Sequence, residues 1–177
     1  MDLLGPLITS KTRLKLLLRF FLNQNLSGYL QGLSKELDEN TNSIRVELNR
    51  LEEAGLLSSE LQGRRKLYRV NDSHPLTSDL TSIVRKVSGI DALVDKVVEN
   101  LPGLSQVWIC GALARGIQGD SIDCLLIGTD LNSKYIAGLS ARVKELTGKK
   151  VNTKVLEQMP DEKREQCLQV WEKGSEQ

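Results

Sequence analysis

Hydrophobic residues recur at helical spacing near the start of the chain, in "LITSKTRLKLLLRFFLN" (residues 7–23). Spacing of this kind is typical of an amphipathic helix. Four of these residues form one stripe: Leu14, Leu17, Leu18 and Phe21. Three more lie off that stripe: Leu16, Phe20 and Leu22. Because a helix that is apolar on more than one face needs a second apolar partner, we expect another domain or a second subunit to cover it.

Residues 28–72 carry two short apolar stripes and then an alternating pattern. The periodicity predicts helices over 30–37 and 41–54, separated by a turn at residues 38–40. Asn40 is expected to cap the second helix through its side-chain oxygen, and Gly55 to end it in a left-handed conformation. The alternation on either side of Gly63 predicts a hairpin. Three helices followed by a hairpin are the element order of a winged helix-turn-helix.

From residue 74 onward the pattern alternates between helices and strands. Helical stripes cover 74–100 with a break at residues 88–89, and a further helix is predicted at 132–148. "LSQVWIC", "SIDCLLIG" and "KKVNTKVLE" predict strands, and "PDEKREQCLQVWEKG" is interpreted as a final helix. We therefore expect a two-domain protein of the α+β or α/β class. Its parts would be a winged helix at 1–74 and, at 75–177, an αβ domain with a small mixed sheet, joined by a linker helix at about 75–88.

The composition of the chain limits the classes of function that it can have. The formal net charge is +1 over 177 residues, so any contact with nucleic acid requires a local basic patch. Charged residues interrupt the N-terminal apolar run, and no segment is long and apolar enough to span a membrane, so we expect a cytoplasmic protein. The chain has three cysteines without a CxxC motif and one histidine. This predicts reduced core thiols, and neither a metal site nor a cofactor.

The segments "TSKTRLKLLLRFFLN" and "LSKELDENTNSIRVELNRLEEAGLLSSELQGRRKLYRVN" resemble the winged-helix domains of ArsR-type and related bacterial transcription regulators. The likeness covers residues 7–72 and implies a domain that reads double-stranded DNA. Burial of Ile44, Leu48 and Leu51 would turn the opposite face of their helix toward the major groove. Arg pairs with guanine and Asn with adenine, whereas hairpin cations contact phosphates or a minor groove. The residues expected to contact DNA are Thr41, Asn42, Ser43, Arg45, Asn49, Arg64, Arg65 and Lys66.

Acidic residues on the same helix leave a second interpretation open, in which the winged helix binds only protein. These residues are Glu47, Glu52 and Glu53. Glu52 and Glu53 fall at the end of the helix away from the expected DNA face, so we favour DNA.

The stretch "VWICGALARGIQGDSIDCLLIG" resembles the minimal nucleotidyltransferase fold, over residues 90–157. In that family a Gly-Ser turn holds a nucleotide phosphate, a short helix carries Ala-Arg-Gly, and an Asp-x-Asp strand with a third acid holds divalent metals. Gly111, Arg115 and Asp123 match this pattern. Ala112 replaces the serine, Ser121 replaces the first acid, and "VNTK" (151–154) offers no third acid.

These replacements predict a nucleotidyltransferase-like fold that lacks the metal-holding acids needed for catalysis. Carboxylates two residues apart share one side of a strand, and two-metal phosphoryl transfer needs such a clamp. Asp120 is one residue out of register and should point to the opposite face, unless the strand entrance is kinked. We therefore expect no enzyme. The domain would serve structure or dimerisation, with an Arg115–Asp123 salt bridge as the simplest role. A second option is a pocket that senses a small-molecule or nucleotide ligand, lined by Gly111, Ala112, Arg115 and Asp123.

Together these features predict a DNA-binding transcriptional regulator. Symmetric dimers read palindromic sites, so we expect a homodimer with its interface on helix 7–23 and the helices at 76–100. Two alternatives remain: an active nucleotidyltransferase that uses the winged helix to reach its substrate or DNA, and a protein-interaction module in which neither domain keeps its ancestral ligand.

Overall fold

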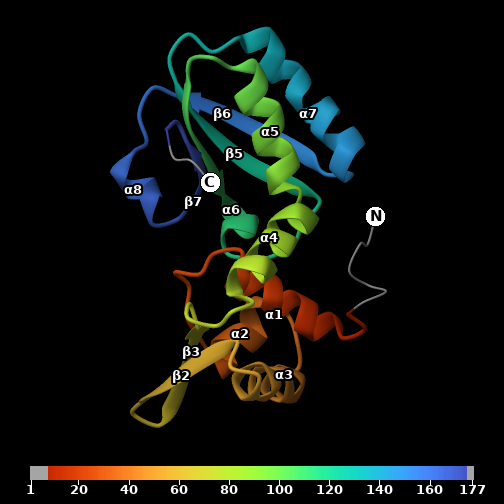
Figure 1. Cartoon of the computed structure of the whole chain (residues 1–177), viewed down its shortest axis with the longest axis vertical. Helices are drawn as coiled ribbons and strands as arrows, with labels where there is room; N and C mark the ends of the chain where they lie inside the picture. Colours follow the sequence, from red (N-terminus) through yellow and green to blue (C-terminus); the bar gives the residue numbers. More distant parts are fainter. Residues whose placement is uncertain (1–7, 175–177) are drawn as a thin grey trace. The chain divides into compact units, whose positions relative to one another are not determined.

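The computed structural model describes residues 8–174, which divide into two compact units (Figure 1). One unit comprises the chain up to Val84 together with Arg115–Ile117, and the other comprises Arg85–Ala114 and the residues from Gln118 onward. The division falls inside helix α4 (Thr77–Ser88), the segment expected to be a linker helix. Within residues 8–174, no helix is long and apolar enough to cross a membrane.

The N-terminal unit has the element order expected for a winged helix. Its elements are α1 (Lys11–Phe21), β1 (Gly28–Tyr29), α2 (Leu30–Glu36), α3 (Thr41–Glu53), β2 (Leu57–Gln62) and β3 (Arg65–Val70). The strands form an antiparallel sheet in the order β1-β3-β2. Strand β1 was not predicted, because two residues are too few to show an alternating pattern.

Helix α1 begins later than its hydrophobic pattern indicates. Ser10 caps it, since its Oγ accepts a hydrogen bond from the backbone N–H of Arg13 at 3.2 Å. Residue 7 of the predicted helix lies outside the described residues. The three apolar residues off the main stripe are almost completely covered within the chain: Leu16 (0% exposed), Phe20 (0%) and Leu22 (4%). Of the two partners expected for this second apolar face, a second subunit is not required, because the chain itself covers these three residues.

Helix α3 confirms the predicted orientation. Ile44 and Leu48 are fully buried and Leu51 is 5% exposed. The Oδ1 of Asn40 accepts a hydrogen bond from the N–H of Asn42 at 2.8 Å, so the predicted cap is present. Gly55 has a φ of +74°, the left-handed conformation that ends helices.

The C-terminal unit is a small mixed sheet with helices, as predicted. After α5 (Ile90–Asn100) come β4 (Leu104–Cys110), α6 (Gly111–Ala114), β5 (Ser121–Gly128), α7 (Ser133–Thr147), β6 (Lys150–Leu156), α8 (Asp161–Arg164) and β7 (Leu168–Glu172). The strand order is β6-β5-β4-β7, with β5 and β6 parallel and the other pairs antiparallel. Helices α5 and α7 pack together against this sheet (Figure 1).

The last segment corrects the prediction of a single final helix. Helix α8 ends at Arg164, and β7 then pairs with β4, with Trp171 opposite Val107 and Gln169 opposite Trp108. The polar residues 161–166 favour a helix, but Leu168 and Val170 alternate at the period of a strand, and Val170 is buried at 5%. Pairing with an open sheet edge outweighs local helix propensity here.

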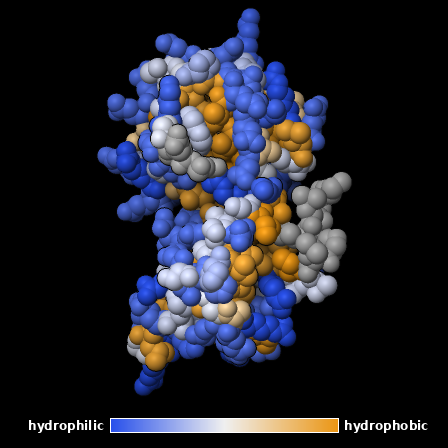
Figure 2. Space-filling view, viewed as in Figure 1, coloured by the Kyte–Doolittle hydropathy of each residue, from blue (hydrophilic) through white to orange (hydrophobic). Residues whose placement is uncertain are grey.

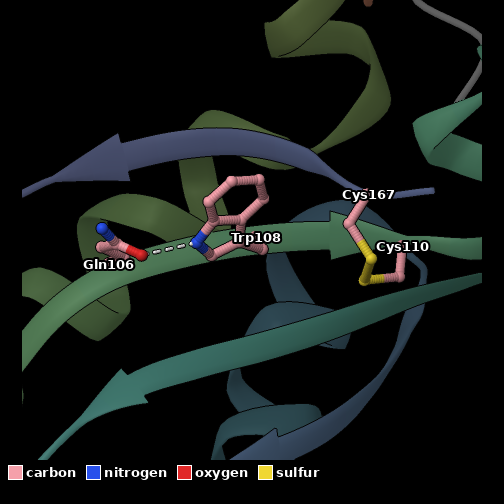
Figure 3. The surroundings of a disulfide bond; sticks show 4 residues. All are labelled: Gln106, Trp108, Cys110 and Cys167. Carbon is pink, nitrogen blue, oxygen red and sulfur yellow. Dashed lines mark hydrogen bonds between the residues drawn. A yellow bond between two sulfur atoms is a disulfide. The ribbon is translucent and has the colours of Figure 1, made fainter. Parts of the chain in front are cut away.

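The cysteines also differ from the sequence expectation of reduced thiols. Cys110 ends β4, Cys167 precedes β7, and the two form a disulfide (Figure 3). The pairing of β7 with β4 brings these strand ends together, which the sequence spacing did not reveal because 57 residues separate them. Cys124 is the free cysteine of the described chain, and burial raises its pKa to about 12, so its thiol is unreactive.

The disulfide predicts a redox-dependent stability. Reduction with a dithiol should lower the free energy of unfolding by about 2–4 kcal/mol, because the bond restricts the unfolded chain. Urea unfolding of the full chain with and without reductant measures this difference. Cys167→Ser should remove the response and Cys124→Ala should keep it, whereas identical curves for the oxidised and reduced parent would show that the bond does not form.

Candidate functional site

An open cavity with a volume of about 700 Å³ lies in the N-terminal unit, between the start of α2, helix α3 and the β2–β3 hairpin. We call it the basic groove. Its lining residues are Tyr29, Leu30, Gln31, Gly32, Lys35, Arg45, Asn49, Arg64, Arg65, Lys66 and Tyr68. Five of these are cations and none is an acid. The groove thus supplies the local positive patch that the near-neutral chain requires if it is to contact nucleic acid.

Three acids of this unit are held by cations outside the groove. Carboxylates of α2, α3 and the turn between them form ion pairs with α1: Glu47–Arg13 (2.8 Å), Glu36–Arg19 (3.0 Å) and Glu39–Lys15 (2.7 Å). Within the described chain, four groove cations have no ion-pair partner: Lys35, Arg45, Arg64 and Arg65. Their charge is therefore not neutralised by the protein and is open to an anionic partner.

The groove brings together five of the eight residues predicted to contact DNA. Arg45 and Asn49, one turn apart on α3, line it together with Arg64, Arg65 and Lys66 of the hairpin. The sequence reasoning missed the α2 side of the groove. Gln31 and Lys35 are exposed four residues apart on α2, a spacing that places both on one helix face.

The other three predicted residues lie elsewhere on α3. Asn42 is exposed, and its Oδ1 accepts a hydrogen bond from Arg45 Nη1 at 3.3 Å. Asn42 and Ser43 line a separate hollow of about 250 Å³ near the start of α1. Thr41 Oγ1 lies 3.0 Å from Ser34 Oγ, so Thr41 joins α2 to α3 and lies outside the groove.

Glu47 is a buried link between helices. It is 5% exposed and accepts hydrogen bonds from Arg13 Nε (2.8 Å) and Ser10 Oγ (2.9 Å). Burial raises the pKa of its carboxyl, but the hydrogen bonds from Arg13 and Ser10 and the charges of Arg13 and Arg50 hold that pKa below its usual value. Glu47 thus fixes α3 to α1 and does not present a negative charge to the groove.

Glu52 differs from the expectation that it lies away from the DNA-contacting surface. Its carboxylate accepts hydrogen bonds from Ser59 on β2 and from Lys66 on β3, the latter at 3.1 Å. The hydrogen bond from Ser59 lowers its pKa most, burial opposes this, and Lys66 lowers it further. Glu52 therefore ties the hairpin to α3 and neutralises one of the five groove cations.

The hairpin tip also carries an apolar side chain. Leu61 is 75% exposed, and Figure 2 shows a hydrophobic patch at the tip of the β2–β3 hairpin. Behind it, the Tyr29 hydroxyl donates a hydrogen bond to Gln62, which connects the hairpin to β1. The tip therefore combines arginines with an uncovered leucine.

In the C-terminal unit, Asp123 is held by Asn152. The two residues are register partners in the parallel β5–β6 pair, and Asn152 Nδ2 donates to Asp123 Oδ1 at 2.8 Å. Gly111 has a φ of +69°, and a Cβ at this position would lie 2.7 Å from Asp123 Oδ2. The glycine therefore provides both the backbone conformation and the space that the carboxylate needs.

The predicted ligand pocket is divided between the units. Gly111, Ala112 and Asp123 belong to the C-terminal unit, whereas Arg115 is exposed and belongs to the N-terminal unit. The Arg115–Asp123 salt bridge therefore stays a prediction.

The donor set around Asp123 does not fit a pair of divalent metals. Ser121 supplies no charge, and Asn152 occupies the place opposite Asp123 on β6. Asp120 lies before β5 and its charge acts on Lys149, where it opposes the lowering of the lysine pKa by burial. Over residues 8–174, no three or more His, Cys, Asp or Glu residues are grouped so that they could hold a metal ion.

Comparison with known proteins gives only remote likenesses. No protein-family model matches the chain, and no curated protein matches it. A crystal structure of a toxin–antitoxin with AMP-PNP is similar at 18% identity and a TM-score of 0.42, over 48% of this chain and 73% of that one. Reduced HlyU from Vibrio cholerae is similar at 16% identity and a TM-score of 0.37, over 46% and 78%.

A third likeness is to the tri-AMPylated Shewanella oneidensis HEPN toxin in complex with the MNT antitoxin. It has 15% identity and a TM-score of 0.39, over 50% of this chain and 72% of that one. All three scores are below 0.5, so none of these proteins identifies the function of this chain.

The buried carboxylate predicts an acid-dependent stability. Glu47→Gln should cost about 1–3 kcal/mol of unfolding free energy at neutral pH, because Arg13 loses its charged partner. The folded-state pKa of Glu47 is below the unfolded value of 4.5, so the stabilisation is complete above that value and is lost as the pH falls through the folded one. Urea unfolding should show the difference between parent and variant shrinking in acid. Glu53→Gln, an exposed acid of the same helix, is the control, and an equal loss at every pH would contradict the assignment.

Proposed function

We propose that the N-terminal unit binds double-stranded DNA and that the chain is a transcriptional regulator. The observation that carries this proposal is the basic groove. It gathers Arg45 and Asn49 of α3 with Arg64 and Arg65 of the hairpin, and its arginines have no acid partner in the described chain. A regulator of this kind acts in the cytoplasm.

In this proposal α3 enters the major groove. Its exposed face carries Asn42, Arg45 and Asn49, and Arg and Asn are the side chains that read guanine and adenine edges. Arg64 and Arg65 contact phosphates or the minor groove beside it. Leu61, exposed at the same tip, adds an apolar contact of the kind that minor-groove proteins use. Lys35 of α2 supplies a further phosphate contact.

We propose that the C-terminal unit is not catalytic. The support comes from the side chains around Asp123: the neighbouring strand presents Asn152, and Ser121 replaces the acid two residues earlier. A carboxylate hydrogen-bonded to an amide is stable without a metal, so the arrangement explains how the fold persists without its acids. Sensing of a small molecule or nucleotide is the second role for this unit, and an active nucleotidyltransferase is the alternative that the test below addresses.

We further propose that the chain acts as a homodimer, because two copies related by twofold symmetry read the two halves of a palindromic site. With α1 covered within the chain, the helices from residue 76 onward remain as the interface from the two expected regions.

DNA binding should depend strongly on salt and on the groove. Arg64→Ala combined with Arg65→Ala should weaken binding to all duplexes and reduce the slope of log affinity against log salt by about 1–2 units, since two phosphate contacts are lost. Lys134→Ala with Lys144→Ala, two exposed lysines of α7, removes the same charge elsewhere and should leave the slope unchanged. Fluorescence anisotropy between low and moderate salt measures both variants, and equal slopes for the two would overturn the groove assignment.

Nucleotidyl transfer should be absent. Incubation with labelled nucleoside triphosphates, magnesium or manganese and candidate acceptors should give no labelled product for the full chain, because a single carboxylate cannot clamp both reacting oxygens. Asn152→Asp returns an acid opposite Asp123 and should increase metal binding, which isothermal titration with manganese detects. Turnover by the parent that disappears in Asp123→Ala would overturn the non-catalytic assignment.

A further inference from the structure

One cation of the basic groove is already held by an acid of the same unit. Lys66 Nζ donates hydrogen bonds to both carboxylate oxygens of Glu52, at 3.2 Å and 3.1 Å. The other four groove cations have no ion-pair partner in the described chain. The two side chains of the pair are partly exposed, at 47% for Lys66 and 29% for Glu52. A molecule bound in the groove would therefore meet this pair.

Glu52 lies on the same face of α3 as the residues expected to read bases. Arg45, Asn49 and Glu52 follow one another at spacings of four and three residues, which places them along one side of a helix. Arg45 and Asn49 line the groove. Glu52 thus continues their row to the end of the helix, beside the hairpin.

The hairpin presents Lys66 on the strand face that approaches α3. Lys66 and Tyr68 are two residues apart on β3 and share one face. Tyr68 is 5% exposed and is the register partner of Ser59 on β2. The Ser59 hydroxyl donates a hydrogen bond to Glu52. A bond from the neighbouring strand therefore fixes the Glu52 carboxylate beside Lys66.

Both members of the pair are charged at neutral pH. The hydrogen bond from Ser59 lowers the pKa of Glu52 most, burial opposes this, and Lys66 lowers it further. The hydrogen bond to Glu52 raises the pKa of Lys66, and partial desolvation opposes that change. The negative and positive charges therefore cancel, and the pair adds no net charge to the groove.

We propose that Glu52 limits sequence-independent DNA binding, because it holds Lys66 away from the phosphate backbone. A cation strengthens that binding when it contacts a phosphate and releases a counterion. Lys66 does not do so while Glu52 neutralises it. The groove then offers four unpaired cations, and a larger share of its affinity depends on the bases that Arg45 and Asn49 contact. This inference rests on the proposed DNA binding.

Glu52→Gln separates the charge of this side chain from its contact with the hairpin. The glutamine carbonyl still accepts a hydrogen bond from Ser59, but it carries no charge to hold Lys66. Anisotropy would measure binding of the full chain to a fluorescent duplex of mixed sequence at several salt concentrations. Glu52→Gln should bind about threefold more tightly than the parent at about 50 mM salt and lose this advantage near about 200 mM, because one phosphate contact steepens the salt slope by about one unit. A structural role alone would not give a gain, since a loosened hairpin weakens binding.

Two further variants locate the effect. Glu53→Gln removes the same charge from the next residue of α3, which is exposed and has no ion pair within residues 8–174. This matched control should keep the salt slope of the parent. Glu52→Gln combined with Lys66→Ala should also return the slope to that of the parent, because the released cation is then absent.

The outcomes separate the restraint by Glu52 from DNA binding itself. Absence of binding by both the parent and Glu52→Gln overturns both proposals. Binding by the parent without a gain in Glu52→Gln overturns the restraint and leaves the proposed function. An equal gain in Glu53→Gln, or a gain that persists after Lys66→Ala, also overturns the restraint, because the gain would then not come from release of Lys66.

Discussion

The burial of one face of α3 determines which side chains this protein presents to a partner. Ile44 and Leu48 are fully covered, and Glu47 between them is fixed to α1 by its ion pair with Arg13. With both the apolar stripe and the buried acid turned inward, the opposite face is left with arginine and asparagine. The anchoring of α3 thus sets both the charge and the geometry of the basic groove.

In the C-terminal unit, the parallel pairing of β5 and β6 places Asn152 directly beside Asp123. A hydrogen bond from the Asn152 amide holds the carboxylate. The Cys110–Cys167 disulfide fastens β7 to β4 one residue before Gly111, so the edge of the same sheet is held covalently.

Much of the fold follows from local patterns. The stripe of α3, the cap at Asn40 and the turn at Gly63 are encoded by neighbouring residues, and they appear where the sequence predicts them. The failures involve long-range partners. Residues 168–172 become a strand because β4 offers an edge, and Cys110 meets Cys167 as a consequence of that pairing. The burial of Phe20 likewise depends on tertiary packing, which helical periodicity does not predict.

The residues of the candidate site also fall into two groups, those that local sequence patterns reveal and those that only the packing reveals. Arg45, Asn49 and the hairpin cations could be found from helix phase and from the basic tip, whereas the contribution of Lys35 required the packing of α2 beside α3. The role of Glu52 was also hidden, because its contact with Lys66 joins residues on two elements. The partner of Asp123 could not be identified as Asn152 until the register of β6 was known.

Selection from random duplexes tests most directly whether α3 reads DNA sequence. The full chain and its Arg45→Ala variant would each be used to recover bound molecules from a pool of random duplex DNA, and the recovered DNA would be sequenced. If α3 reads DNA sequence, the parent should enrich a palindrome with half-sites about 10 base pairs apart. Arg45→Ala should lose the preference at one position in each half-site, at a cost of about 1–3 kcal/mol. Recovery of no preferred sequence by the parent, or of the same palindrome with every position unchanged by Arg45→Ala, would contradict it.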